Sequence, residues 1–286
     1  MLVKLYRFSL AFLSFGLVNL RKEDFAMAQC DTPEEQKICV DGWNINYLKV
    51  GTGEHPVLLL PGALGSIWSH FRPQIEGLDK GKFTIVAWDP PGYGKSRPPN
   101  RTFPDDFFQR DATLARNLMK RLGYSKFSLL GWSDGGITSL ILAAMFPENV
   151  RKMISVAANA YVTPEEARSY RQYQNIDTWT EELRRPLVEL YGEEYFRELW
   201  FNWVDAILRI SGKQDGDICK TYLPNIRCPT LIVHGRNDTG VVIEHPIYLK
   251  EHIAGAKLKI FEKGEHDLHL QYPEEFNTLV TKFLTE

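Results

Sequence analysis

The sequence contains little that would indicate a disulfide-rich, nucleic-acid-binding or metal-binding protein. Only 4 of its 286 residues are cysteine, and no two have C-x-x-C spacing, so we expect free thiols in a reducing compartment. The formal net charge is −2, without a run of Lys or Arg, which argues against a nucleic-acid partner. His/Cys clusters with metal spacing and phosphate-binding or dinucleotide-binding glycine loops are also missing. We therefore expect no metal and no cofactor.

Acidic residues are absent from the first 22 residues, and residues 8–20 carry no charge. On a helix the basic residues fall on one side, as in a mitochondrial presequence. We expect residues 1–28 to be a targeting segment and the protein to be mitochondrial. Two alternatives remain: a start at Met27 would make it cytoplasmic, and Ala26-Met27-Ala28 resembles a secretory cleavage site, which the preceding charged residues disfavour. The apolar stretch is too short for a stable membrane span.

Apolar segments of strand length recur along the rest of the chain, and helical segments separate several of them. Strands are expected at residues 36–40, 43–50, 56–60, 83–88, 126–130, 150–157, 230–235 and 256–261. Helices are expected at about 105–122, 137–145 and 273–284. The first two strands flank Asp41-Gly42, a strong hairpin signal. The other strands alternate with helices, which predicts right-handed crossovers and a mostly parallel sheet of the α/β class.

The strand pattern is interrupted between residues 159 and 223. This segment is rich in aromatic and charged residues and has the pattern of amphipathic helices. Most of the aromatic side chains are accounted for by a small core of the segment's own. Because it lies between two core strands, we expect it to form a cap over the strand ends, where open α/β sheets bind ligands. The predicted organisation is a core of residues 36–158 and 224–286 with a helical cap at 159–223.

One short stretch, Gly131-Trp132-Ser133-Asp134-Gly135-Gly136, lies between a predicted strand and a predicted helix. Strand, Gly-x-Ser-x-Gly and helix in this order form the nucleophile elbow of α/β-hydrolases. Gly131 and Gly135 lack a Cβ, so neighbouring backbone can approach while Ser133 occupies the strained turn. The pattern predicts Ser133 as a nucleophile; a Gly-Ser turn between two core elements is the simpler alternative.

A serine nucleophile needs a base, and the base needs an orienting acid. In α/β-hydrolases the chain order is Ser, then Asp or Glu, then His. Asp238 and His266 each follow a predicted strand directly, so both are expected at the same rim of the sheet as Ser133. His269 competes with His266, which lies nearer the strand end. We therefore predict Ser133, Asp238 and His266 as the catalytic triad.

The oxyanion hole is expected to come from backbone amides. One donor is the amide of the residue after the nucleophile, Asp134, and the second belongs to the loop after the third strand. Ala63 in Pro61-Gly62-Ala63 is the best candidate for that second donor. In comparable sites each such donor contributes about 3 kcal/mol.

The side chain of Asp134 places a carboxylate beside a developing oxyanion. This charge should oppose catalysis unless a positive charge offsets it. The carboxylate could merely complement the helix N-terminus, which is worth about 0.3–1 kcal/mol. A cationic substrate explains this carboxylate better, because an ammonium two or three bonds from the scissile carbonyl would pair with Asp134 and offset its charge. We therefore predict that Asp134 binds substrate.

Four segments give the chain a resemblance to the biphenyl hydrolase-like proteins, also called valacyclovir hydrolases. They are the elbow extended to Thr138, residues 86–94, residues 158–163 and residues 264–270. The likeness covers about residue 40 to the C-terminus. It implies an α/β-hydrolase fold, a Ser133–Asp238–His266 triad, hydrolysis of α-amino acid esters, and Asp134 as the carboxylate that recognises the α-amino group. The sequence departs from the family in having Thr239-Gly240 after the acid, where a proline-containing turn is expected.

The expected function is that of a serine hydrolase acting on small-molecule amino acid esters as a monomer. A carbon–carbon bond hydrolase or a general carboxylesterase on the same scaffold is an alternative, as is a ligand-binding protein that lacks turnover.

Overall fold

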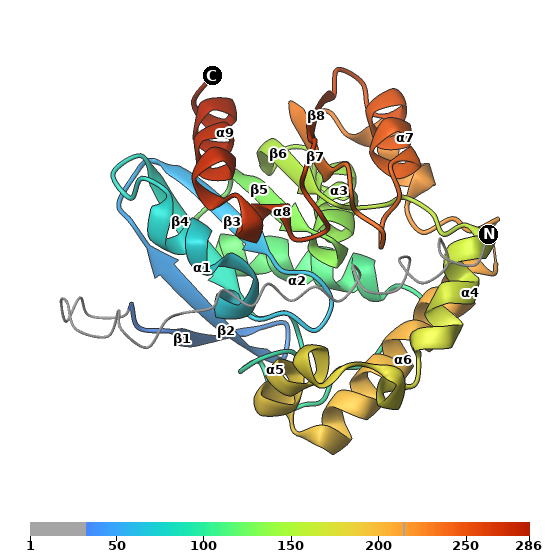
Figure 1. Ribbon diagram of the computed structural model, residues 1–286. Helices are drawn as coiled ribbons and strands as arrows, with labels where there is room; N and C mark the ends of the chain where they lie inside the picture. The colour runs from blue at the N-terminus through green and yellow to red at the C-terminus, as the bar shows by residue number, and fades with distance from the viewer. Residues whose placement is uncertain (1–32, 214) are drawn as a thin grey trace.

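The computed structural model of the protein describes residues 33–213 and 215–286 (Figure 1). The predicted targeting segment, residues 1–28, lies outside the described residues, so the mitochondrial location stays a prediction. In the described part of the chain, eight strands form one sheet in the order β1-β2-β4-β3-β5-β6-β7-β8. The strands are β1 (Gln36–Val40), β2 (Trp43–Val50), β3 (His55–Leu60), β4 (Phe83–Trp88), β5 (Phe127–Trp132), β6 (Val150–Val156), β7 (Thr230–Gly235) and β8 (Lys257–Phe261).

The predicted hairpin and the mostly parallel sheet are both confirmed. Val40 pairs with Trp43 across the Asp41-Gly42 turn, and β2 runs antiparallel to β4. All remaining neighbours are parallel. Every residue of β4, β5 and β7 is buried, as expected for parallel strands covered on both faces.

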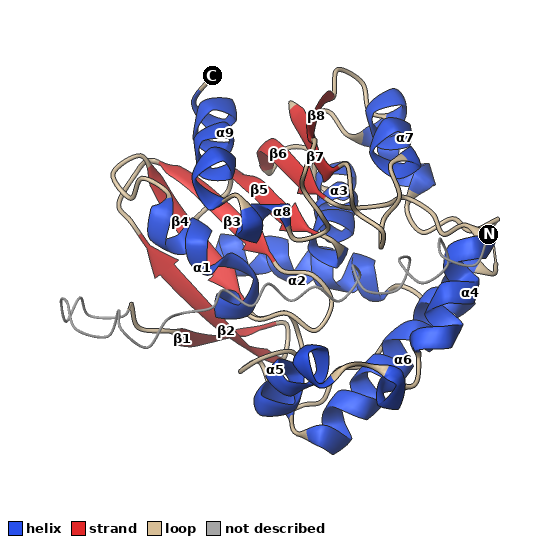
Figure 2. Ribbon diagram, in the orientation of Figure 1, coloured by secondary structure: helices blue, strands red, loops and turns tan. Residues whose placement is uncertain are grey.

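Helices cover the two faces of the sheet, and others form the segment between β6 and β7 that is predicted as a cap (Figure 2). They are α1 (Ile67–Gly77), α2 (Phe107–Arg121), α3 (Asp134–Met145), α4 (Pro164–Tyr173), α5 (Glu181–Tyr191), α6 (Glu193–Ser211), α7 (Glu244–His252), α8 (Leu268–Gln271) and α9 (Pro273–Thr285). The buried apolar side chains of α1 and α9 belong to one apolar cluster, and those of α2 and α3 belong to another. None of the described helices is both long and apolar enough to cross a membrane.

Helices α1 and α7 were not predicted from the sequence. Helix α1 contains Pro73 and has neither an acidic residue in its first turn nor a basic residue in its last, so the usual charge signals are missing. Its start is marked only by a capping box between Ser66 and Ser69. The predicted strand ends agree with the structure to within two residues, and β5 extends to Trp132.

The excursion between β6 and β7 contains α4, α5 and α6, which lie away from the sheet in Figure 1. Its aromatic residues largely pack on one another: Trp179 meets Trp200 edge-on, and Trp200 stacks on Trp203, with ring centroids 4.9 Å apart in both pairs. A buried contact joins this segment to the core, where Glu166 of α4 lies 2.7 Å from the imidazole of His245 in α7.

Candidate active site

The turn between β5 and α3 has the strained geometry expected of a nucleophile elbow. Ser133, between the last residue of the strand and the first of the helix, has φ +55°. A Cβ on Gly131 would lie 2.2 Å from the carbonyl oxygen of Gly135, and one on Gly135 would lie 1.9 Å from that of Leu60. Only glycine fits at either position, because strand, turn and helix backbones approach so closely.

The structure brings together the three residues predicted as the triad. The Nε2 atom of His266 lies 3.1 Å from Ser133 Oγ, and its Nδ1 atom lies 2.8 Å from Asp238 Oδ2. Since the carboxylate accepts from Nδ1–H, Nε2 is left as the acceptor for the serine hydroxyl. Nucleophile, base and acid are all buried, with Ser133 8% exposed.

The electrostatics of the pair favour an ionised Asp238 and stabilise the imidazolium that His266 forms during catalysis. Burial alone would lower the pKa of His266, but the adjacent Asp238 carboxylate outweighs it, so the pKa is raised above 6.5. Burial alone would raise the pKa of Asp238, but His266 and further hydrogen bonds lower it below 3.8. Asp238 therefore stays ionised and stabilises the imidazolium that forms when His266 accepts a proton.

The acid is held by its own loop despite the Thr239-Gly240 departure. Asp238 Oδ1 accepts hydrogen bonds of 2.9 Å from the amides of Gly240 and Val241. The buried imidazole of His234, from the end of β7, lies 2.8 Å from the carbonyl oxygen of Val241. The loop thus fixes the carboxylate without a proline.

His269, the competing base, does not reach the site. Its Nε2 atom lies 2.9 Å from the backbone oxygen of His70 in α1. Burial lowers its pKa to about 3. The structure therefore places His266, and not His269, between the serine and the carboxylate.

The loop that contains Ala63 lies against the nucleophile. A Cβ on Gly62 would be 3.1 Å from Ser133 Cβ, and the Gly62 amide donates a 3.2 Å hydrogen bond to Nδ1 of His70. Burial holds the pKa of His70 well below 6.5, which keeps that nitrogen an acceptor. In the described part of the chain, the amides of Ala63 and Asp134 have no hydrogen-bond acceptor. Both are therefore available to an oxyanion beside Ser133.

The carboxylate of Asp134 faces the cap. Its Oδ2 atom accepts a 2.7 Å hydrogen bond from the indole N–H of Trp203 in α6, and the residue is 8% exposed. Burial raises the pKa of Asp134 to about 7, although Trp203 and the Arg101 guanidinium oppose the rise. A negative charge here is costly unless it is paired, and the indole N–H of Trp203 is one such partner.

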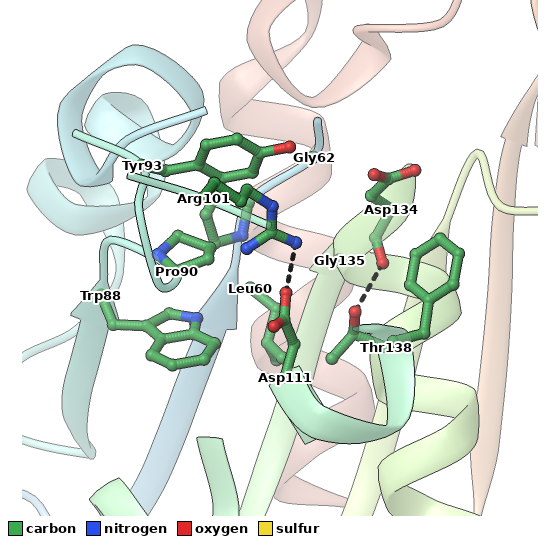
Figure 3. Close-up of a pocket in the computed structure, with 12 residues that line it drawn as sticks. Leu60, Gly62, Trp88, Pro90, Tyr93, Arg101, Asp111, Asp134, Gly135 and Thr138 are labelled. Atoms are coloured by element: carbon green, nitrogen blue, oxygen red, sulfur yellow. Dashed lines mark hydrogen bonds and ion pairs between the residues drawn. The ribbon is translucent and has the colours of Figure 1, made fainter. Parts of the chain in front are cut away.

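A small cavity extends inward from Asp134 (Figure 3). Arg101 and Asp111 line it and form a buried ion pair of 2.5 Å. These two residues and Trp203 were not singled out from the sequence. Trp203 is one of several aromatic residues in α6 and also stacks on Trp200, whereas Arg101 lies in an irregular loop, so neither had a distinctive sequence pattern. Within the described residues, no group of three or more His, Cys, Asp or Glu side chains could hold a metal ion.

Comparison with known proteins agrees with this geometry. A family model described as "alpha/beta hydrolase fold" matches residues 55–187. The mouse protein "Serine hydrolase BPHL" is 50% identical over 87% of this chain and 85% of its own length. A 2-hydroxy-6-oxononadienedioate/2-hydroxy-6-oxononatrienedioate hydrolase of Escherichia coli is 30% identical over 84% of this chain and 90% of its own length.

Among solved structures, a 2-hydroxy-6-oxo-6-phenylhexa-2,4-dienoate hydrolase from a Rhodococcus strain has the same fold, with a TM-score of 0.75 and 22% identity. The match covers 89% of this chain and 99% of that one. The chain therefore belongs to the α/β-hydrolase superfamily and, within it, to the biphenyl hydrolase-like serine hydrolases.

Proposed function

We propose that this serine hydrolase cleaves esters of α-amino acids through an acyl-enzyme on Ser133. The observation that carries the proposal is the buried carboxylate of Asp134 directly beside the nucleophile. The α-ammonium of such an ester lies two bonds from the scissile carbonyl carbon. It can pair with Asp134 while the carbonyl faces Ser133, so one contact supplies both charge balance and orientation.

Acylation follows from the positions of the triad. Ser133 Oγ attacks the ester carbonyl carbon while its proton passes to His266 Nε2, 3.1 Å away. Asp238 stabilises the resulting imidazolium, and the amides of Ala63 and Asp134 receive the oxyanion. The tetrahedral intermediate then expels the alcohol, which takes the proton from His266.

Deacylation repeats the sequence with water. His266 Nε2 removes a proton from water as the water oxygen attacks the acyl carbon. When the second tetrahedral intermediate collapses, His266 gives that proton to the departing Ser133 Oγ. The carboxylic acid released from Ser133 loses its proton to solvent. The amino acid then carries both of its charges, and its new carboxylate lies near Asp134. Repulsion between the two carboxylates favours release of the product.

The decisive test compares one valine or phenylalanine ester with its N-acetyl form. We expect the wild type to prefer the free amine, and Asp134→Asn to reduce kcat/KM for the free amine about 30-fold or more, since losing a buried charge partner costs about 2 kcal/mol or more. The N-acetyl ester should change little. Equal losses on both esters would mean that Asp134 is structural.

A second candidate is carbon–carbon bond hydrolysis, because the 30% identical E. coli relative is named for a dienedioate substrate. That substrate carries two carboxylates, which the buried carboxylate of Asp134 would repel. Turnover of a dienedioate faster than of any amino acid ester would favour this candidate.

A ligand-binding protein without turnover is separated from both candidates by a fluorophosphonate probe. The probe should label the wild type and not Ser133→Ala. An unlabelled wild type would exclude a working serine nucleophile.

A further inference from the structure

The cavity beside Asp134 has a volume of about 10 Å³, which is room for about one water molecule. Three charged side chains line it: Asp134, Arg101 and Asp111. One guanidinium therefore lies close to the carboxylate that is proposed to bind an ammonium. A substrate cation and Arg101 would compete for the same negative charge, unless another group holds the guanidinium.

Asp111 is that group. Arg101 donates a 2.5 Å hydrogen bond from Nη2 to Asp111 Oδ2, and another of 2.8 Å from Nη1 to the Pro91 carbonyl. Its guanidinium carbon lies 4.2 Å from the ring centre of Tyr93. In Figure 3 a dashed line joins Arg101 to Asp111, whereas the dashed line at Asp134 joins its backbone oxygen to Thr138 and none joins its carboxylate to Arg101. These contacts hold the guanidinium against Asp111, the Pro91 carbonyl and the Tyr93 ring.

One hydrogen-bond donor of the Arg101 side chain is unused in the described part of the structure. The Nε–H of Arg101 has no hydrogen-bond partner among the described residues, although the side chain is only 2% exposed. A buried, unused donor beside a carboxylate is costly. Without Asp111, a turn of the guanidinium toward Asp134 would satisfy that donor and neutralise both charges.

Asp111 also has a second cationic neighbour outside the cavity. Arg110 donates to the other oxygen, Oδ1, from Nε at 3.2 Å and from Nη2 at 3.1 Å. Its side chain is 19% exposed and does not line the cavity. The two arginines thus bind the same carboxylate from different sides, and of the two only Arg101 lines the cavity beside Asp134.

We propose that Asp111 is a specificity-determining residue: by holding Arg101, it leaves the charge of Asp134 to the ammonium of the substrate. The proposal rests on the function proposed above. Asp111 is not expected to touch substrate, and its effect is on the choice between charged and neutral acyl groups.

The test is the ratio of kcat/KM for a free-amino ester to that for its N-acetyl form, measured at one pH near neutrality. Asp111→Asn keeps the size of the side chain and removes its charge. We expect the ratio to fall tenfold or more, with the N-acetyl ester changing less than threefold. Arg110→Gln, the matched control on the other oxygen of Asp111, should leave the ratio unchanged.

A double variant keeps the proposal open to refutation if Asp111→Asn does not fold. Arg101→Met with Asp111→Leu removes both charges and leaves neither buried alone, so the ratio should stay within threefold of the wild type. A tenfold fall in this double variant, or an unchanged ratio in Asp111→Asn, would overturn the proposal. A wild type that shows no preference for the free amine would instead overturn the proposed function itself.

Discussion

The indole N–H of Trp203, in the cap, donates a hydrogen bond of 2.7 Å to the carboxylate of Asp134, in the core. This bond favours the ionised carboxylate and lowers its pKa, against the larger effect of burial. The cap therefore helps to set the charge of the group that the substrate is proposed to meet.

Replacing Trp203 with Phe should raise the pKa of Asp134 above its present value of about 7. The acid limb of the pH profile of kcat/KM for an amino acid ester should move to higher pH by about one to two units, because a hydrogen bond to a charged group is worth about 1.5–3 kcal/mol. The profile for the N-acetyl ester should stay in place. An identical shift for both esters would point to His266 as the group affected.

Two groups of the wild type should lose activity by gaining protons as the pH falls. Asp134, with a pKa of about 7, must be ionised to bind an ammonium, and His266, with a pKa raised above 6.5, must be neutral to act as base. Below both pKa values, log kcat/KM for amino acid esters should fall with a slope of two per pH unit, because two groups take up a proton. For N-acetyl esters the slope should be one, because only His266 matters. Parallel slopes for the two substrates would contradict a role for Asp134.

His70 should act as a positioning residue for the oxyanion loop, because its Nδ1 atom accepts from the Gly62 amide. His70→Leu should reduce kcat by about 10- to 100-fold with little change in KM. This loss is smaller than that from removing an oxyanion donor completely, because the donor is misplaced and not absent. His70→Asn, whose Oδ1 atom can take the place of Nδ1, should recover most of the rate.

A boronic acid analogue of an amino acid separates positioning from general damage in these His70 variants. It forms a tetrahedral adduct with the serine, so its affinity should fall in parallel with kcat. A loss of kcat without a loss of boronate affinity would place the role of His70 elsewhere.

The buried contact between His245 and Glu166 should stabilise the attachment of the cap. His245→Phe leaves the Glu166 carboxylate buried without its imidazole partner, which should cost about 3 kcal/mol in the free energy of unfolding. Arg168→Ala, which removes an exposed ion pair with Glu165 on the same helix, should cost less than about 1 kcal/mol. Denaturant unfolding of both variants checks this, and equal small losses would contradict it.

The sequence predicted the strands and the relative placement of the triad because both depend on local order. Asp238 and His266 each follow a buried parallel strand, and parallel strands bring their carboxyl ends to one rim. The choice between His266 and His269 also followed from distance to the strand end, and the structure agrees with it. Helix α1 was not predicted because it contains Pro73 and lacks the charged residues that usually mark the two ends of a helix.

Contacts between distant segments could not be predicted in the same way. Trp203 meets Asp134 across 69 positions of sequence, and nothing in the aromatic pattern of α6 distinguishes this ring from the ones that pack within the cap. The Arg101–Asp111 pair joins an irregular loop to α2. The role proposed for this pair depends on the cavity behind Asp134, which forms only when the sheet, α2 and α3 are assembled.

Tyr191, the last residue of α5, donates a hydrogen bond of 2.9 Å to the carbonyl oxygen of Leu64 and accepts one of 3.1 Å from the Gly94 amide. A residue of the cap thus supports the loop that begins at Pro61. For protein engineering, the cap is consequently not an interchangeable module: a chimera that imports another cap to change substrate range would also remove a support of the catalytic loop. Grafts that retain a tyrosine at this position should keep turnover, whereas grafts without one should bind new substrates and process them slowly.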